Sequence, residues 1–378
     1  MKITEIRLSV FELPSATRRF RLVDDGHPSR LAFLRRNEPA GREDVHVLHV
    51  RTDDGVEGIC TVGDVRYTRM KPEDLEQLRL LAIGEDPLAR ERLHYKIGGA
   101  TRQAFAVPGW SGAFDNCLWD IAGKVTGLPV FKLLGAARSD VPAYYNFLGD
   151  TLDKALADAE KARQSGFRIL KDHFGNDART NCDWFAATRA RFPGAVLLHD
   201  AALCSYSFEE ALRIGRHLVD LGYRWFEEPL ADRRKADLKS LCESLDIPIA
   251  GCETMMGDHV LCAEWLRDNA VDIVRGNGRH GTTALLKLAA MAECYATTIE
   301  LNGPGGLFGL VNVHLCCGIP ATSYYEFFSG GARDLVGKEM GLLNPPLPDK
   351  GYIRPPDVPG WGALWDRPYF EKVRKAFI

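Results

Sequence analysis

The sequence lacks the features that mark membrane and nucleic-acid-binding proteins. No apolar run approaches the 18 residues of a membrane-spanning helix, and residues 1–13 alternate like a strand rather than a signal peptide. Neither sign of charge is in excess, since 48 lysines and arginines stand against 51 acidic residues. This balance argues against a nucleic-acid partner or a membrane surface.

The cysteines, although ten in number, lack any ligand or disulfide pattern. They are scattered from Cys60 to Cys317, none forms a CxxC, and the closest pair is the adjacent Cys316-Cys317. That spacing excludes a zinc site and a small disulfide scaffold. We expect reduced thiols, packed as small hydrophobic side chains, in a cytoplasmic protein.

What is present is ordinary globular composition, 46% hydrophobic and 26% charged over 378 residues. The first part, residues 1–137, predicts a small α+β unit. Its strands are expected at 1–13 and 45–63, the second turning at Asp53-Asp54-Gly55, and its helices at 72–84, 86–99 and 112–127. Residues 16–44 show no clean period and predict a mobile loop, of the kind that often forms a lid.

From Val141 onward, strand and helix patterns alternate strictly. Strand and helix in alternation imply parallel strands, and eight such units imply a closed (β/α)₈ TIM barrel, here over residues 138–331. Residues 332–378, rich in proline and glycine, are expected to return to the N-terminal unit and complete it as a capping domain. The eight predicted strands are 141–148, 167–173, 196–200, 223–229, 247–253, 271–277, 297–302 and 323–328.

Polar residues stand at the carboxyl ends of these strands, where barrel enzymes carry their chemistry. From the third strand onward they recur every 24 to 27 positions, which places them at one level of the barrel. Helix N-caps would explain one or two of them, but three acids on adjacent strands repel one another unless a cation lies among them. The set comprises Lys171, His173, Asp200, Glu227-Glu228, Glu253, Asn277, Asn302 and Glu326.

Three carboxylates without Cys or His suit a hard cation such as Mg²⁺. Because side chains alternate along a strand, Glu227 is expected to face into the barrel with Trp225. Glu228 would then face the helix layer, where we expect a salt bridge. The predicted metal ligands are therefore Asp200, Glu227 and Glu253.

By the same alternation, Lys171 and His173 share one face of the second strand and Asp172 takes the other. Taken alone, such a pair also fits a strand that runs out into a solvated loop. Whether the pair has a functional role depends on what the ends of the later strands carry.

At this point the chain resembles the enolase superfamily, and within it the mandelate racemase subgroup, over nearly its whole length. The resemblance is carried by GAFDNCLWDIAGKVTGLPVFKLLG, WFEEPL, IPIAGCE and DVPGWGALWD. It implies a capping domain on a modified barrel, one Mg²⁺ on the three predicted ligands, and removal of a proton α to a carboxylate. Superfamily sites use a Lys or His base with Mg²⁺ stabilising the ene-diolate.

The resemblance also implies roles for individual residues. His173 takes the base position of a second-strand motif that commonly reads Lys-x-Lys, and Lys171 would lie nearer the substrate carboxylate. Glu326, in SYYEFF, matches an eighth-strand carboxylate that helps to hold the substrate carboxylate; an ordinary strand-end acid is the alternative. The predicted lid contains four basic residues that are suited to bind carboxylates and hydroxyls: Arg18, Arg19, Arg21 and His27. The alternative is that they form a solvated basic face.

The chain departs from the subgroup where many members carry a second base. A His on the seventh strand paired with an Asp on the sixth is replaced here by Asn302 and Asn277. Asparagine does not titrate near neutral pH, so we expect these two to hold substrate hydroxyls or water. His280 and His314 lie nearby in sequence, but in the following loop and helix.

A site with bases on one face favours β-elimination of water from a sugar acid, giving a 2-keto-3-deoxy acid, because racemisation needs a group on each face. The alternatives are a racemase or epimerase that uses both Lys171 and His173, a cycloisomerase, or a non-catalytic binding relative. The expected ligands are Mg²⁺ and a small sugar acid. We also expect a homo-oligomer.

Overall fold

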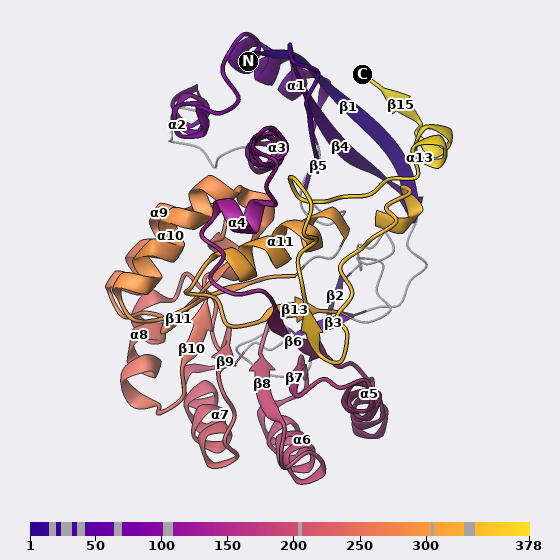
Figure 1. The fold of residues 1–378 in the computed structure, drawn as a ribbon. Coiled ribbons are helices and arrows are strands. Elements are labelled where there is room, and N and C mark those ends of the chain that lie inside the picture. The colour runs from indigo at the N-terminus through magenta and orange to yellow at the C-terminus, as the bar shows by residue number, and fades with distance from the viewer. Residues whose placement is uncertain are drawn as a thin grey trace.

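A computed structural model describes residues 1–14, 20–23, 32–35, 42–63, 70–100, 109–202, 206–303, 306–328 and 337–378. A four-stranded antiparallel sheet lies at one end of the molecule, and both termini lie beside it (Figure 1). Its order is β15 (Ala376–Phe377), β1 (Ile3–Pro14), β4 (Arg42–Thr52) and β5 (Glu57–Thr61). The last strand of the chain thus completes the sheet that the first strand begins.

Helix α3 (Trp110–Thr126) joins this sheet to the barrel. It is buried over most of its length and ends at Gly127, whose φ of 69° suits a left-handed C-cap. The Asn116 amide donates to the carbonyl of Gly278 in the barrel at 2.7 Å, while Asp120 accepts from the Ile59 amide at 3.1 Å. The other helices of this part are α1 (Pro72–Ala82), α2 (Arg90–Ala100) and α4 (Val130–Leu133).

The segment expected to be a mobile loop contains a short two-stranded ladder. Strands β2 (Phe20–Val23) and β3 (Ala32–Arg35) pair antiparallel, with Leu22 opposite Phe33. Four-residue strands are too short to show a clear period in the sequence, which is why the pattern missed them. Arg18, Arg19 and His27 lie outside the described residues, as does the side chain of Arg21.

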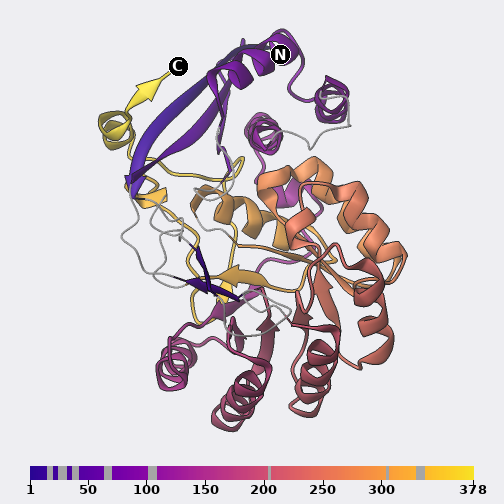
Figure 2. The same cartoon turned by 180° about the vertical axis from the view of Figure 1, so that it is seen from behind.

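Eight parallel strands form the predicted closed barrel, confirmed by the pairing of the last strand with the first. In chain order they are β6 (Val141–Asn146), β7 (Ile169–Asp172), β8 (Val196–Asp200), β9 (Phe226–Glu227), β10 (Ile249–Gly251), β11 (Ile273–Gly276), β12 (Ile299–Leu301) and β13 (Tyr325–Phe327). Helices surround it (Figures 1 and 2): α5 (Leu152–Gln164), α6 (Ala178–Arg191), α7 (Phe208–Asp220), α8 (Lys235–Ser244), α9 (His259–Arg267), α10 (Thr282–Cys294) and α11 (Gly306–Gly318).

The barrel interior is plugged by apolar side chains below the level of the strand ends. They alternate with outward-facing residues, as a period of two requires. The plug consists of Tyr144, Ile169, Leu198, Trp225, Ala250 and Ile273. Above it, the next inward positions carry the polar residues of the site.

The C-terminal segment contacts both parts of the molecule. Strand β14 (Tyr352–Ile353) pairs antiparallel with β6 of the barrel, whereas β15 pairs with β1. Helix α13 (Arg367–Val373) lies between them in sequence and packs Phe370 against Phe11 at 4.8 Å between ring centroids. The division into residues 1–137, 138–331 and 332–378 stays a prediction.

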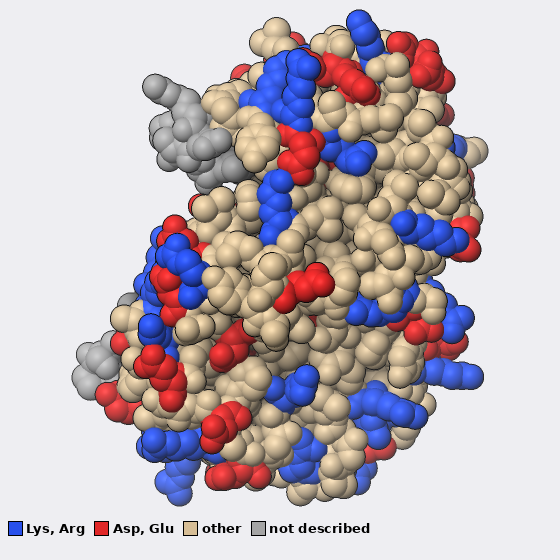
Figure 3. Space-filling model, turned by 60° about the vertical axis from the view of Figure 1, so that its left-hand side comes forward, with Lys and Arg blue, Asp and Glu red and all other residues tan. Residues whose placement is uncertain are grey.

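In the described part of the chain, none of the helices is both long enough and apolar enough to span a membrane. The nine described cysteines are free thiols, and most of them are buried. On the face shown in Figure 3, positive and negative side chains are interspersed. The interspersed charges agree with the near balance of basic and acidic residues in the sequence.

Candidate active site

Lys171 lies among three of the predicted carboxylates at the carboxyl end of the barrel. Its Nζ is 2.9 Å from Asp200 Oδ2, 2.8 Å from Glu227 Oε2 and 3.4 Å from Glu326 Oε1. Burial by itself would lower the pKa of Lys171, but the charges of the surrounding carboxylates raise it well above its ordinary value. The side chain is therefore a fixed positive charge inside the site.

His173 lies one step further along the same face, as the alternation predicted. Its Nε2 is 3.1 Å from Asp200 Oδ2, and its side chain is 14% exposed, whereas that of Lys171 is 1% exposed. Nδ1 of His173 has no hydrogen-bond partner among the described residues. Of the two basic groups on this strand, His173 is thus the one whose side chain is partly exposed, although the nitrogen without a partner, Nδ1, is itself buried.

Asp172 points away from the barrel interior, into the layer of helices. Its Oδ1 is 2.6 Å from Nδ1 of His199, the residue opposite it on β8, and both side chains are fully buried. The ring of Phe185 lies 4.5 Å from that of His199. The sequence argument missed His199, although its place immediately before Asp200 puts it on the outward face.

Arg275 is a second buried cation that the sequence argument missed. It projects inward from β11 and its Nη2 is 2.9 Å from Glu326 Oε2. Its Nε is 2.9 Å from Glu227 Oε1 and 3.5 Å from Glu253 Oε2. The signal was available, because Arg275 stands two positions before Asn277 and alternation gives the two residues the same face.

The pKa values of two neighbouring buried carboxylates shift in opposite directions. Burial raises the pKa of Asp200 in isolation, but Lys171 and His173 hold it well below its ordinary value. For Glu227, burial prevails over the attraction of Arg275 and Lys171 and raises the pKa to about 8. Both oxygens of Glu227 lie close to a cation but have no hydrogen bond among the described residues. We attribute the higher pKa of Glu227 to these missing hydrogen bonds, which would otherwise stabilise its charged form.

No basic side chain in the described part of the chain pairs with Glu228, for which a salt bridge in the helix layer was expected. Its backbone has a positive φ of 46°, which turns the chain at the strand end. Burial, then the charges of Glu253, Asp200 and other acids, raises the pKa of Glu228 well above its ordinary value. The expectation rested on regular strand alternation, which stops at Glu227, where β9 ends.

Glu253 follows β10 in a short 3₁₀ turn, η1 (Glu253–Met255). The turn is held by Asp232, whose carboxylate accepts from the Cys252 amide at 2.7 Å and from the Thr254 amide at 2.9 Å. Cys252 has a φ of 75°, a left-handed conformation that a non-glycine residue keeps only under tertiary restraint. Asp232 therefore positions the predicted ligand Glu253.

The asparagines at the sixth and seventh strand ends form hydrogen bonds to each other and to neighbouring protein groups. Asn277 Nδ2 donates to the carbonyl and the side-chain oxygen of Asn302, at 2.8 and 3.0 Å, and its Oδ1 accepts from the Arg279 amide. Asn302 Nδ2 lies 3.3 Å from Glu253 Oε1 and 3.1 Å from Glu326 Oε2. Asn277 thus positions Asn302, and Asn302 links the two carboxylates.

Glu326 is almost completely buried and accepts from several donors. Besides Arg275 and Lys171, the Gly303 amide donates to Oε2 at 2.9 Å and Asn146 Nδ2 to Oε1 at 3.3 Å. Its place within reach of Lys171 agrees with the role implied by the resemblance. Whether it holds a substrate carboxylate stays a prediction.

The two histidines set aside in the sequence lie apart from this cluster. His314 is buried in α11, where Nδ1 accepts from the Phe131 amide at 3.1 Å and Nε2 donates to the Trp361 carbonyl at 3.2 Å. Burial lowers its pKa to about 3. His280 lies in the turn η2 (Gly278–His280) that follows β11.

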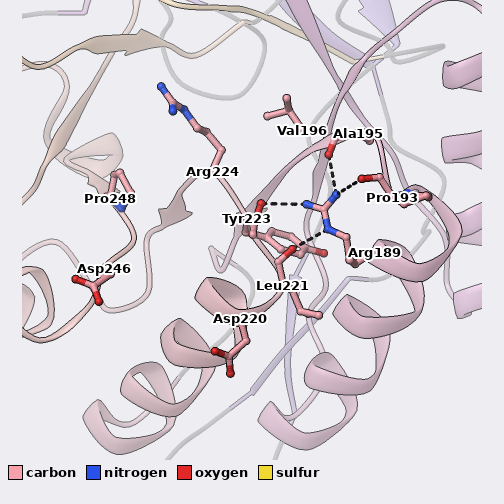
Figure 4. A pocket seen from close by; sticks show the side chains of 11 residues that line it. Arg189, Pro193, Ala195, Val196, Asp220, Leu221, Tyr223, Arg224, Asp246 and Pro248 are labelled. Carbon is pink, nitrogen blue, oxygen red and sulfur yellow. Dashed lines mark hydrogen bonds between the residues drawn. The ribbon is translucent and has the colours of Figure 1, made fainter.

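A hollow of about 710 Å³ lies at the opposite end of the barrel, at the starts of β8, β9 and β10 (Figure 4). Arg189 crosses its wall and donates to backbone carbonyls, including those of Leu221 at 2.7 Å and Ala195 at 2.8 Å. The polar strand ends described above are not part of its lining. The hollow is therefore separate from the candidate active site.

The side chains as they stand do not form a finished metal centre. In the part of the chain that the structure describes, no three His, Cys, Asp or Glu side chains are arranged to hold a metal ion. Lys171 and Arg275 lie between the carboxylates and account for this. The donor chemistry nevertheless fits Mg²⁺, because hard carboxylate oxygens predominate and both oxygens of buried Glu227 lack hydrogen bonds to any described residue.

Comparison with known families identifies the chain. Residues 154–369 match the model for the enolase C-terminal domain-like family. Residues 20–135 match the N-terminal domain of mandelate racemase/muconate lactonizing enzyme. The chain belongs to the mandelate racemase/muconate lactonizing enzyme family.

Relatives in this enolase-superfamily group carry out more than one reaction. Arabinonate dehydratase of Saccharolobus solfataricus is 31% identical over 311 residues, covering 79% of this chain and 81% of that protein. A 3,6-anhydro-alpha-L-galactonate cycloisomerase of Streptomyces coelicolor is 26% identical over 400 residues, covering 100% of this chain and 99% of the relative. The chain is thus similar both to a dehydratase and to a cycloisomerase.

A solved structure agrees with this placement. D-glucarate dehydratase from Agrobacterium tumefaciens, complexed with magnesium, superposes with a TM-score of 0.80 at 28% identity, covering 100% of both chains. The family membership makes this chain an enolase-superfamily enzyme. It leaves the substrate and the reaction to be inferred from the site.

Proposed function

We propose that this enzyme is a Mg²⁺-dependent acid-sugar dehydratase. It would remove the α-proton of a sugar acid and expel the β-hydroxyl, giving a 2-keto-3-deoxy acid. The observation that carries the proposal is the one-sided arrangement of bases. Nδ1 of His173 has no hydrogen-bond partner in the described part of the chain, whereas the positions for an opposing base hold Asn277 and Asn302, whose amides do not titrate.

The predicted ligands of Mg²⁺ remain Asp200, Glu227 and Glu253. When bound, Mg²⁺ supplies the positive charge that stabilises the dianion formed when the α-proton leaves. Because Lys171 now contacts Asp200 and Glu227, metal binding would require these side chains to separate. Lys171 would then neutralise the substrate carboxylate at the same end of the barrel.

His173 would act as the base and then as the acid. Asp200 lies beside Nε2, and Nδ1, although buried, has no hydrogen-bond partner among the described residues, so Nδ1 would accept the proton. The same nitrogen, once protonated, would donate to the β-hydroxyl if that group leaves from the same face of the substrate. A single residue would thus serve both halves of the elimination.

A screen of sugar acids tests the proposal directly. Aldonic, aldaric and uronic acids are incubated with the enzyme and Mg²⁺, and the 2-keto-3-deoxy product is detected with semicarbazide. Substrates carrying α-deuterium are followed in parallel by NMR. Formation of the keto product with loss of the α-label supports a dehydratase.

The alternatives give different products in the same screen. Loss of α-deuterium without loss of water would indicate a racemase or epimerase, and rearrangement of a lactone or anhydro sugar acid would indicate a cycloisomerase. Binding of a sugar acid without turnover would indicate a non-catalytic relative. Any of these results contradicts the dehydratase proposal.

A further inference from the structure

Arg275 is a permanent positive charge in the middle of the carboxylate cluster. Its side chain is fully buried, and its Nη1 also donates to the Tyr144 hydroxyl at 3.3 Å. A guanidinium does not lose its proton in proteins, so this charge persists at every pH at which the protein is folded. The cluster therefore contains a positive charge even when no metal is bound.

The contacts of Arg275 differ in kind. To Glu326 it donates an aligned hydrogen bond at 2.9 Å from Nη2. To Glu227 and Glu253 its Nε is close, at 2.9 and 3.5 Å, but Nε has no aligned hydrogen bond among the described residues. Arg275 is thus fixed by Glu326 and acts on the other two carboxylates through its charge.

Those two carboxylates are proposed ligands of the metal, while the third, Asp200, contacts Lys171 and His173 instead. A charge held beside Glu227 and Glu253 attracts the same oxygens that a divalent cation needs. It also repels the cation, and this repulsion is poorly screened in a buried site of low dielectric.

We propose that Arg275 is a positioning residue that competes with the divalent cation for Glu227 and Glu253 and so keeps the metal affinity of this enzyme moderate. The inference rests on the proposed function, because it requires Mg²⁺ at those carboxylates. It assigns a role to a residue outside the predicted ligand set.

Calorimetric titration of Mg²⁺ into the metal-free enzyme, without substrate, tests this. Arg275→Gln is expected to bind Mg²⁺ at least about tenfold more tightly than the wild type, because a repelling charge is gone. Arg275→Lys keeps that charge and is expected to stay within about threefold of the wild type. A residue with only a structural role would leave the affinity unchanged or weaken it.

Arg189→Lys is the matched control, since Arg189 bonds to backbone carbonyls at the other end of the barrel (Figure 4). It is expected to lower the melting temperature and leave Mg²⁺ affinity unchanged. If Arg275→Gln does not fold, the double variant Arg275→Gln/Glu326→Gln removes both members of the aligned pair. Because Glu326→Gln also removes a negative charge, the double variant is compared with Glu326→Gln alone and is expected to bind Mg²⁺ more tightly than that single variant.

The outcomes separate the two proposals. If the wild type binds Mg²⁺ and the folded Arg275 variants bind it with equal or lower affinity, the competition inference is overturned and the proposed function stands. If the wild type binds no Mg²⁺ in the presence or absence of a sugar acid, the proposed function itself fails. The inference is supported if the variants that remove the charge of Arg275 bind Mg²⁺ more tightly and Arg275→Lys does not.

Discussion

His173 is the residue on which the proposed chemistry depends most. His173→Asn keeps a polar side chain of similar size but cannot accept a proton near neutral pH. We expect α-proton exchange and dehydration to fall together by about 10²–10⁴-fold, the usual contribution of a placed general base. Deuterium exchange by NMR and the keto-acid assay measure the two activities, and calorimetry should show that Mg²⁺ still binds.

Lys171→Met provides the comparison at the same strand end. Because Lys171 contributes charge and not a proton acceptor, its loss should raise KM for the substrate as well as lower kcat. The base assignment is wrong if His173→Asn retains exchange while Lys171→Met abolishes it without a change in KM.

At the scale of the element, helix α11 contains a buried histidine, His314, whose pKa is lowered by folding. The folded pKa of His314 is about 3, below the value of about 6.5 expected in the unfolded chain. As the pH falls below 6.5, the unfolded state takes up a proton that the folded state does not, so stability is present above pH 6.5 and is lost toward pH 3. Acid should therefore destabilise the protein through this residue.

Between pH 7.5 and 5, this linkage should cost about 2 kcal/mol of unfolding free energy. His314→Gln removes the titrating group, and we expect a correspondingly shallower loss of stability over the same range. Urea unfolding of both proteins at the two pH values measures the difference. Equal pH dependence in the two proteins would show that folding does not lower the pKa of His314.

Helix α3 also illustrates how closely two elements can approach. A Cβ on Gly112 would lie 2.0 Å from the Arg279 carbonyl oxygen, whereas a Cβ on Gly99 in α2 meets no atom within 4 Å. We expect Gly112→Ala to destabilise the protein by about 1–3 kcal/mol through overpacking. Gly99→Ala should instead stabilise by up to about 1 kcal/mol, since alanine favours helix.

Chemical denaturation of the two glycine variants decides between these expectations. If both substitutions have the same effect, the contact between α3 and η2 yields readily and α3 does not fix the capping sheet against the barrel.

For the whole molecule, a metal bound at the proposed ligands on β8, β9 and the turn after β10 would link metal binding to folding. Mg²⁺ at about 100 times its dissociation constant should raise the unfolding free energy by about 2.7 kcal/mol, because the unfolded chain does not assemble the three ligands. Thermal melting with Mg²⁺ or a chelator measures this without any substrate. An unchanged melting temperature, or full activity in the chelator, would contradict the metal proposal.

The sequence by itself determined the barrel and most of the inward-facing set. Strand alternation is local, so it correctly placed Lys171, His173 and Asp200 on the inner face and Asp172 on the outer one. The period from strand to strand likewise put the acids at one end of the barrel. These conclusions needed no knowledge of which side chains finally touch.

Only the tertiary structure decided how those side chains share their charges. Arg275 reaches Glu326 across the closed barrel, Asn277 is committed to Asn302, and the backbone of Glu228 takes a positive φ past the end of its strand. Such contacts join residues far apart in the chain, and their energies depend on burial and distance within the folded barrel. Periodicity carries no information about either quantity, which is why the sequence left them open.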